Sequence, residues 1–428
     1  MQKLTALVAL LAVFTLAICF ILIGSISEEI KVALVIDNSQ VGSLASSLFF
    51  TSLAVQLFIG VLVDKLGHKV LATTGFFVTS GAILLLAFAG QFRTAMVECA
   101  LLGVGAMCVN TVGNTLIPIV LFDGRDPARA SNFGNGFVGL AFVLTPVVLG
   151  YLMQNAGFSY SAALSSIAVL VLLFGLLAVT AKYPQVSTGY HLSQAIGLLR
   201  EPPVWIAALA LLCYIALESS LSTWIKPFMT ELYGGASNAQ ATQYATWVLG
   251  AFGLAMAVGR FAASALRNLT AIGSRLVAGL CLASIFAIVV MVFARRPALA
   301  IGAILLTGLA LAPIFPTIVG VTFAQYEPRL YGSIFGIIFA VGLLGPTIVP
   351  KLIGHFSVGA GVHEGPGGAV DALLLLLLGV PAGVHEGLGG AEVDGAAAVT
   401  ATRRSESRDP PIAARRRPTP SSWCRAAS

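Results

Sequence analysis

The first long stretch of the chain, residues 4–27, reads LTALVALLAVFTLAICFILIGSIS and contains no charged residue. As a helix, these 24 residues would span about 36 Å. That length exceeds the roughly 30 Å hydrocarbon core of a bilayer. The alternative, a cleaved signal peptide, has a shorter apolar region. The stretch therefore predicts a membrane-spanning helix.

Ten further apolar runs of similar length follow, at about 42–62, 70–90, 94–120, 133–153, 160–181, 203–227, 241–263, 275–293, 297–319 and 331–350. The 428-residue chain is 57% hydrophobic and 10% charged, whereas a soluble domain is about 25% charged. The runs are continuously apolar instead of alternating, which excludes a strand barrel. We therefore expect an all-α, polytopic membrane protein whose main partner is the lipid bilayer.

The distribution of Lys and Arg predicts the orientation. With the N-terminus inside, eleven of these residues up to residue 351 are cytoplasmic and six are outside. The cytoplasmic set is Lys3, Lys65, Lys69, Arg125, Arg129, Lys182, Arg200, Arg260, Arg267, Arg275 and Arg329, and the outer set is Lys31, Arg93, Lys226, Arg295, Arg296 and Lys351. The positive-inside rule predicts a cytoplasmic N-terminus in the cell membrane, although the outer Arg295 and Arg296 oppose it. Because the basic residues are scattered singly, the net charge of +6 indicates no nucleic-acid partner.

The longest polar interval between the runs, 182–202, divides the chain. It predicts an N-terminal six-helix bundle at 1–181, a cytoplasmic linker at 182–202 and a C-terminal bundle with five clear helices at 203–356. The remaining tail, 357–428, repeats the letters AGVHEG and holds no apolar run long enough to span a bilayer. We expect a twelfth helix to be missing or damaged, and this tail to be disordered or frame-shifted.

The segment between the second and third runs, GVLVDKLGHK at 60–69, frames one acid and two bases with glycines. It resembles the signature loop of the major facilitator superfamily, which has Gly, three residues, Asp, a base, any residue, Gly, any residue and a base. The resemblance implies a gating role for Gly60, Asp64, Lys65, Gly67 and Lys69. The alternative is a generic basic loop. The second-half counterpart, 259–275, is degenerate and lacks the acid.

Motifs further along the chain resemble the fucose and glucose/galactose proton symporter branch of that superfamily. Tyr214, Glu218 and Trp224 match its seventh helix. The other matches are Gly103, Gly105, Asn110 and Asn114 in the fourth helix, Asn132, Asn135, Gly139, Pro146 and Gly150 in the fifth, Gly308, Pro313 and Pro316 in the tenth, and Gly332, Gly336, Gly342, Gly345 and Pro350 in the eleventh. The resemblance implies the superfamily's architecture of six plus six helices and proton-coupled uptake of a small polar solute such as a sugar.

Ionisable and amide side chains inside the apolar runs are the candidate site. Glu218 is either a coupling or substrate-binding acid, or an acid paired structurally with Lys226 or a backbone group. Asn110 and Asn114 share one helix face and offer amides either to solute hydroxyls or to neighbouring helices. Members of the branch can carry Glu where this chain has Asn110, and an amide cannot titrate, which weakens proton coupling through the fourth helix.

Four further side chains complete the candidate set. Asn135 offers a third amide. Tyr214 and Trp224 either stack on a sugar ring or anchor a helix at the interface. Glu29 is either a solvated charge at the outer rim or a second coupling acid. The prolines Pro146, Pro313 and Pro316 predict helix bends.

Other functions find little support in the sequence. There is no phosphate loop, metal-ligand spacing or paired nucleophile and base, so we expect no enzyme, no metal and no cofactor beyond a proton as coupling ion. The six cysteines show no paired spacing and are expected to be small core residues. We expect a monomeric transporter. An exporter of amphipathic compounds and a non-transporting product without helix twelve remain alternatives.

Overall fold

The computed structural model describes residues 2–184, 196–233 and 239–349 of the chain. All regular structure in these ranges is helical, and eleven helical segments are long and apolar enough to cross a membrane. The expected all-α, polytopic fold with eleven spans is therefore confirmed. The described residues belong to one compact unit that ends at Leu373.

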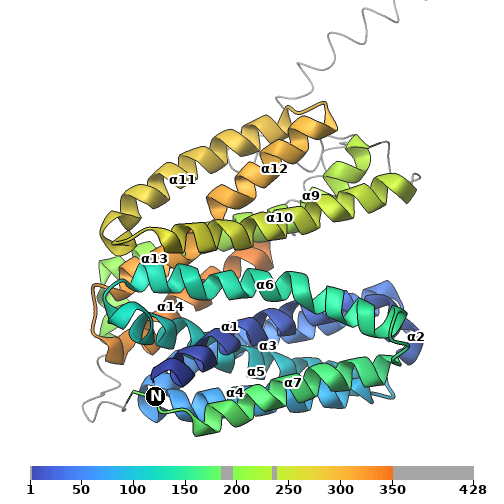
Figure 1. Ribbon diagram of the computed structural model, residues 1–428, viewed down its shortest axis with the longest axis horizontal. Coiled ribbons are helices and arrows are strands. Elements are labelled where there is room, and N and C mark those ends of the chain that lie inside the picture. The colour runs from blue at the N-terminus through green and yellow to red at the C-terminus, as the bar shows by residue number, and fades with distance from the viewer. Residues whose placement is uncertain (1, 185–195, 234–238, 350–428) are drawn as a thin grey trace, which may run out of the picture. The chain divides into compact units, whose positions relative to one another are not determined.

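The first half of the chain forms one helical bundle (Figure 1). Its helices are α1 (Gln2–Ser25), α2 (Ser27–Leu34), α3 (Asn38–Leu66), α4 (His68–Ala87), α5 (Phe92–Val120), α6 (Pro127–Gln154) and α7 (Tyr160–Thr180), with a short 3-10 helix, η1 (Phe122–Gly124), before α6. Helix α5 packs against α1, α3 and α4, and α4 packs against α7. Since α5 is packed on several sides, its residues from Gly103 to Pro118 are almost all buried.

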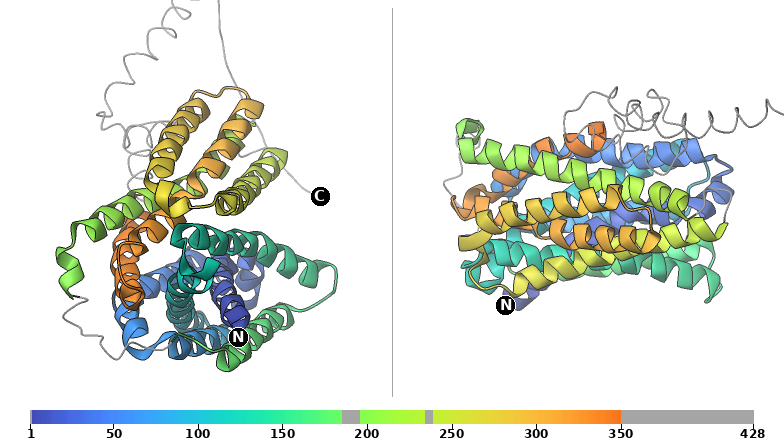
Figure 2. Two further views of the ribbon diagram at one scale, coloured as in Figure 1. Left: turned by 60° about the vertical axis from the view of Figure 1, so that its left-hand side comes forward. Right: turned by 90° about the horizontal axis from the view of Figure 1, so that it is seen from above.

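The second half forms the other bundle. Its helices are η2 (Leu198–Arg200), α9 (Pro202–Leu232), α10 (Ala239–Ala265), α11 (Leu269–Val292), α12 (Pro297–Leu311), α13 (Ile314–Phe323), η3 (Pro328–Leu330) and α14 (Tyr331–Gly342). Helix α9 packs against α10 and α14, and α12 packs against α10 and α11. The long helices of both halves run roughly along one common direction (Figure 2).

Side chains at the helix starts complete the backbone hydrogen bonding. Asp37 and Gln40 form a capping box at the start of α3, in which Gln40 N donates to Asp37 Oδ1 over 2.8 Å. Ser159 accepts from the amide of Ala162 at the start of α7. Such caps matter because the first amides of a helix have no partner within the helix. They mark the starts of α3 and α7, whereas α4, α5 and α11 begin without a side-chain cap.

The tenth span is broken between α12 and α13, as its prolines predict. Helix α12 ends at Leu311 and α13 begins at Ile314. Proline has no amide hydrogen, so Pro316 cannot donate to the carbonyl of Ala312, four residues earlier. That carbonyl is left open to another donor. Pro146, by contrast, lies inside an uninterrupted α6.

Two seams join the bundles. In one seam, α3 packs against α14, and in the other, α6 packs against α10, α11 and α13. The first seam is tight because Gly60 faces the backbone of Gly332 and Gly336, and a Cβ atom on Gly60 would come within 2.8 Å of the Gly336 Cα. These seams bring residues from the two halves of the sequence together.

Two sequence expectations need comment here. Cys19, Cys99 and Cys108 are buried as expected, but Cys213 and Cys281 are exposed, so the expectation of core positions is wrong for these two. Both lie on long spans, where an exposed apolar face meets lipid instead of protein. Helix α7 ends at Thr180, just before the proposed linker at 182–202. The short helix η2 lies within that range, and α9 begins at its last residue, Pro202. The tail at 357–428 lies outside the described residues.

Candidate functional site

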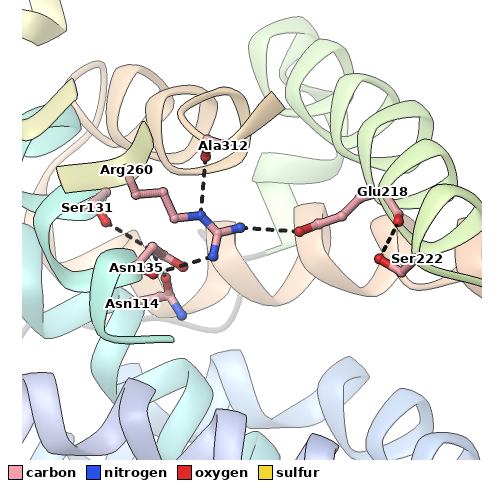
Figure 3. A network of polar contacts seen from close by, with 7 residues as sticks. All are labelled: Asn114, Ser131, Asn135, Glu218, Ser222, Arg260 and Ala312. Atoms are coloured by element: carbon pink, nitrogen blue, oxygen red, sulfur yellow. Dashed lines mark hydrogen bonds and ion pairs between the residues drawn. The ribbon is translucent and has the colours of Figure 1, made fainter. Parts of the chain in front are cut away.

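An ion pair between α9 and α10 stands at the centre of the candidate site (Figure 3). The Arg260 Nη2 atom lies 3.3 Å from Glu218 Oε1. The side chain of Arg260 is 7% exposed and that of Glu218 is 29% exposed. The base is thus buried, whereas the acid is partly open. A charged pair inside a membrane span is costly and marks a functional site by default.

Two backbone carbonyls also hold the Arg260 guanidinium. Its Nε donates to the Ala312 carbonyl over 3.2 Å, and its Nη1 donates to the Asn135 carbonyl over 3.4 Å. The first is the carbonyl that Pro316 leaves without a helical donor. The second belongs to α6 of the first bundle. The Arg260 side chain therefore contacts three elements: α9, the break in the tenth span, and α6 of the first bundle.

A chain of asparagine amides continues from this point into the first bundle. Asn135 Nδ2 donates to Asn114 Oδ1 over 3.1 Å, and Asn114 Nδ2 donates to Asn110 Oδ1 over 2.8 Å. Asn114 and Asn135 appear in Figure 3 beside the guanidinium. The predicted shared face of Asn110 and Asn114 is confirmed by this bond. The polar chain runs from α5 through α6 to α10 and α9.

Several buried polar atoms around this chain have no hydrogen-bond partner among the described residues. The nitrogen donors among them include Asn110 Nδ2 and Trp224 Nε1. Tyr214 lies one turn before Glu218 on α9, and its ring centroid is 6.1 Å from that of Phe315. Buried polar groups are normally hydrogen-bonded. These donors therefore need a partner that the described residues do not supply.

Glu29 lies apart from this polar chain. The first span continues past Ser25 as α2, which carries Glu28 and Glu29. Glu29 lines a shallow pocket with Glu28, Val32, Ala33 and Tyr160. The structure thus groups Glu29 with the end of the first span and the start of α7, and not with Glu218.

The residues of the proposed gating loop meet the second bundle through Asp64. Its Oδ1 accepts from the amide of Gly332 over 2.9 Å, and its Oδ2 accepts from the amide and hydroxyl of Ser333, each over 2.6 Å. Asp64 therefore caps the start of α14, where the helix dipole favours a negative charge. Lys65 and Lys69 are exposed, and Gly67 turns the chain between α3 and α4 with a φ of 85°.

A comparison with known protein families shows which family the chain belongs to. The sequence profile of the Major Facilitator Superfamily matches residues 6–350. The chain belongs to the major facilitator superfamily. It is therefore a multi-pass membrane protein of a transporter superfamily, as expected.

Several curated transporters are similar in sequence. The synaptic vesicular amine transporter of Bos taurus is 26% identical over 202 residues, which are 45% of this chain and 38% of that protein. The vesicular acetylcholine transporter of Homo sapiens is 25% identical over 229 residues, or 50% of this chain and 42% of that protein. The matched part of the chain thus spans less than half the length of these relatives.

Solved structures of the superfamily share the fold. The transporter FucP in its outward conformation matches with a TM-score of 0.68 at 18% identity, covering 86% of this chain and 95% of FucP. The human organic anion transporter MFSD10 matches with a TM-score of 0.63 at 16% identity, covering 87% of this chain and 98% of MFSD10. The expected two-bundle fold of the superfamily is thereby confirmed.

The sequence interpretation of one central residue is wrong. Arg260 is expected among the cytoplasmic loop cations, but it lies inside α10 and is buried. The proposed structural partner of Glu218, Lys226, is exposed, and the observed partner is Arg260. The sequence does carry a signal, since Arg260 interrupts the apolar run at 241–263 just as Glu218 interrupts its own. The pairing itself is hidden because the residues lie 42 positions apart.

Replacing Arg260 with Lys should lower the stability of the protein. Lysine keeps the charge but loses the planar fork that reaches Glu218, Ala312 and Asn135 together. Because each lost hydrogen bond costs about 1 kcal/mol, we expect a loss of about 1–2 kcal/mol, measured by thermal unfolding in detergent. Arg267→Lys is the matched control, since Arg267 is exposed in the loop after α10. Equal melting temperatures for the two variants would contradict the assigned role.

Proposed function

We propose that this chain is an alternating-access secondary transporter that takes up a small polar solute together with protons. The observation that carries the proposal is the Glu218–Arg260 pair, which joins α9 and α10 and reaches the first bundle through Asn135. Sites of secondary transporters lie between their two halves. The pair occupies such a position, and it contains a partly exposed group that can accept a proton.

Protonation of Glu218 supplies a means of coupling. Ionised Glu218 attracts one edge of the guanidinium toward α9, while another edge donates to the Asn135 carbonyl on α6. A proton on the acid removes that attraction, so Arg260 can strengthen its bond to α6 or donate to a solute oxygen. A proton on Glu218 also leaves the buried Arg260 charge without its acidic partner, which is costly to enclose. A solute oxygen that accepts from Arg260 would offset this cost, so proton binding and solute binding would favour each other.

The buried donors without a hydrogen-bond partner favour a solute with several oxygen atoms. Asn110 Nδ2 and Trp224 Nε1 each have an unused N–H bond. A hydroxylated ring such as a monosaccharide can accept from these donors and stack on the aromatic faces. The fold likeness to a protein described as the E. coli fucose:proton symporter supports this substrate class.

An organic cation is the second candidate solute. The two partners of the ion pair differ in exposure, and this difference supports a cationic solute. The Glu218 side chain is 29% exposed, whereas that of Arg260 is only 7% exposed. The site thus presents a carboxylate beside aromatic rings, which suits a protonated amine. The sequence relatives are described as transporters of amines and of acetylcholine. Export of amphipathic compounds belongs with this alternative.

Transport by reconstituted protein tests these proposals. The full chain is placed in proteoliposomes, and uptake of radiolabelled monosaccharides and organic amines is measured with and without an imposed pH gradient. Sugar accumulation driven by inward proton flow is the expected result. Amine accumulation driven by outward proton flow would instead support the cation alternative. Well-folded protein that moves neither class of solute would overturn both and favour a non-transporting chain.

The oligomeric state, the membrane location and the orientation of the transporter are also part of the proposal. A monomer suffices, because the residues of the polar chain all come from one polypeptide. The Lys and Arg distribution supports a cytoplasmic N-terminus, and we propose the cell membrane as the location. Labelling of an added N-terminal tag in intact and permeabilised cells measures this orientation. Labelling before permeabilisation would contradict it.

A further inference from the structure

A second carboxylate of the first bundle caps a helix start of the second bundle. Asp126, just before α6, accepts from the amide of Leu269 over 2.9 Å through Oδ2. Its Oδ1 accepts from the amide of Thr270 over 3.0 Å and from the Thr270 hydroxyl over 2.6 Å. Leu269 and Thr270 are the first two residues of α11. Asp126 is buried, so these bonds form away from water.

Neighbouring residues of α6 reinforce this junction. Three of them reach three different elements of the second bundle: Ala128 N donates to Thr270 Oγ1 over 3.0 Å, Arg129 Nε to the Ser264 carbonyl over 2.8 Å, and Asn132 Nδ2 to Thr317 Oγ1 over 2.9 Å. Asp126, Arg129 and Asn132 follow at spacings of three, so they share one helix face. The face ends, one turn further, at Asn135 and its bond with Arg260.

The junction lies on the same face of the protein as the Asp64 cap. The chain crosses the membrane twice, as α4 and α5, between the end of α3 and the start of α6. Two crossings return it to the face where it began. Asp64 at the end of α3 and Asp126 at the start of α6 are therefore on one face, and each meets a helix start of the second bundle.

Asp126 also accounts for an acid that is missing from the second half of the sequence. The second-half counterpart of the signature loop, at 259–275, contains no acid. Asp126 supplies one from the opposite side of the seam, and it caps α11 directly behind that loop. Burial alone would raise the pKa of Asp126, but hydrogen bonds from Thr270, Arg129 and Leu269 outweigh burial and lower it. Such a group stabilises above its unfolded pKa and loses its effect only as the pH falls through the folded pKa.

We propose that Asp126 is a second gating residue, which locks the same face as Asp64 and replaces the acid missing from the second-half loop. Both locks use a carboxylate of the first bundle and a helix start of the second bundle. The face therefore opens only when two separate sets of hydrogen bonds break. This inference rests on membership of the superfamily and goes beyond the proposed substrate and coupling.

Labelling of an introduced cysteine tests the lock without any transport assay. Ser264→Cys is the reporter, because this side chain is buried at the seam and Arg129 bonds only its carbonyl. The exposed Cys213 and Cys281, and Cys424, are replaced by Ser in the background. Asp126→Asn should speed maleimide labelling of this reporter by roughly three- to tenfold. Asp64→Asn should act similarly, and the double variant should exceed either single variant.

A control substitution at another acid and a second reporter cysteine distinguish gating from a general loss of packing. Asp123→Asn removes an exposed acid three residues away and should leave the labelling rate unchanged. Ser222→Cys, one turn past Glu218 toward the other face, should label more slowly in Asp126→Asn as that face closes. Thr270→Val, which keeps the acid, should give a smaller shift in the same directions. Equal labelling in Asp126→Asn and Asp123→Asn, or faster labelling of both reporters, would overturn the proposal.

Discussion

Replacing Glu218 with Gln is expected to abolish solute accumulation driven by a pH gradient. A gradient of one pH unit stores about 1.36 kcal/mol per proton, enough for about tenfold accumulation if one proton moves with each solute. Glutamine keeps the size of the side chain but cannot release a proton. The variant should therefore only equilibrate the solute across the membrane. The measurement is the ratio of internal to external label in proteoliposomes at steady state.

Exchange of labelled for unlabelled solute should survive this substitution. Exchange needs no net proton movement, and Arg260 keeps its bonds to Ala312 and Asn135. The matched control is Glu28→Gln, which neutralises an exposed acid paired with Lys31 on α2. This control should accumulate solute normally. Gradient-driven accumulation that persists in Glu218→Gln would rule out Glu218 as the coupling acid and leave it as the structural partner of Arg260.

Replacing Gly332 with Val is expected to prevent closure of the seam between α3 and α14. A side chain on Gly332 would collide with Val63, with Asp64 and with the Gly60 carbonyl. Overpacking of a tight interface costs about 1–3 kcal/mol, and about 1.4 kcal/mol is a factor of ten in an equilibrium. We therefore expect the closed population to fall roughly tenfold or more, measured as faster maleimide labelling of the Ser264→Cys reporter.

A glycine in open surroundings controls for the change of residue type. Nothing lies within 4 Å of a Cβ atom placed on Gly81 in α4. Gly81→Val should therefore leave labelling at the seam unchanged. Thermal unfolding of both variants separates a shift between conformations from loss of the fold. If Gly332→Val labelled as slowly as Gly81→Val while remaining folded, the two helices would not need their close contact for closure.

Much of the fold was predictable from local properties of the sequence. A run of about 20 apolar residues can satisfy its backbone only as a helix in lipid, so the eleven spans and their approximate bounds followed directly. The break in the tenth span was predictable for a similar reason, since Pro313 and Pro316 lack amide hydrogens. The exposed positions of Cys213 and Cys281 were not predictable, because apolar residues suit a lipid-facing surface as well as a core.

The candidate site was predictable only in part. Glu218 and the asparagines stood out because polar groups are expensive in an apolar run. The same criterion applies to Arg260, but its position near the end of a run made it resemble a loop cation. Asp126 gave no comparable signal, since it lies in a polar loop where acids are common. Its importance depends on the start of α11, more than 140 positions away.

The sequence by itself determined the helices, their number among the described residues and the membrane as their surroundings, because these depend on hydrophobicity and hydrogen bonding within each segment. Tertiary structure alone decided which charges meet. The pairing of Glu218 with Arg260, and the capping of α14 and α11 by Asp64 and Asp126, join residues from separate spans. A charge finds its partner through the packing of whole helices, and no single segment encodes that packing.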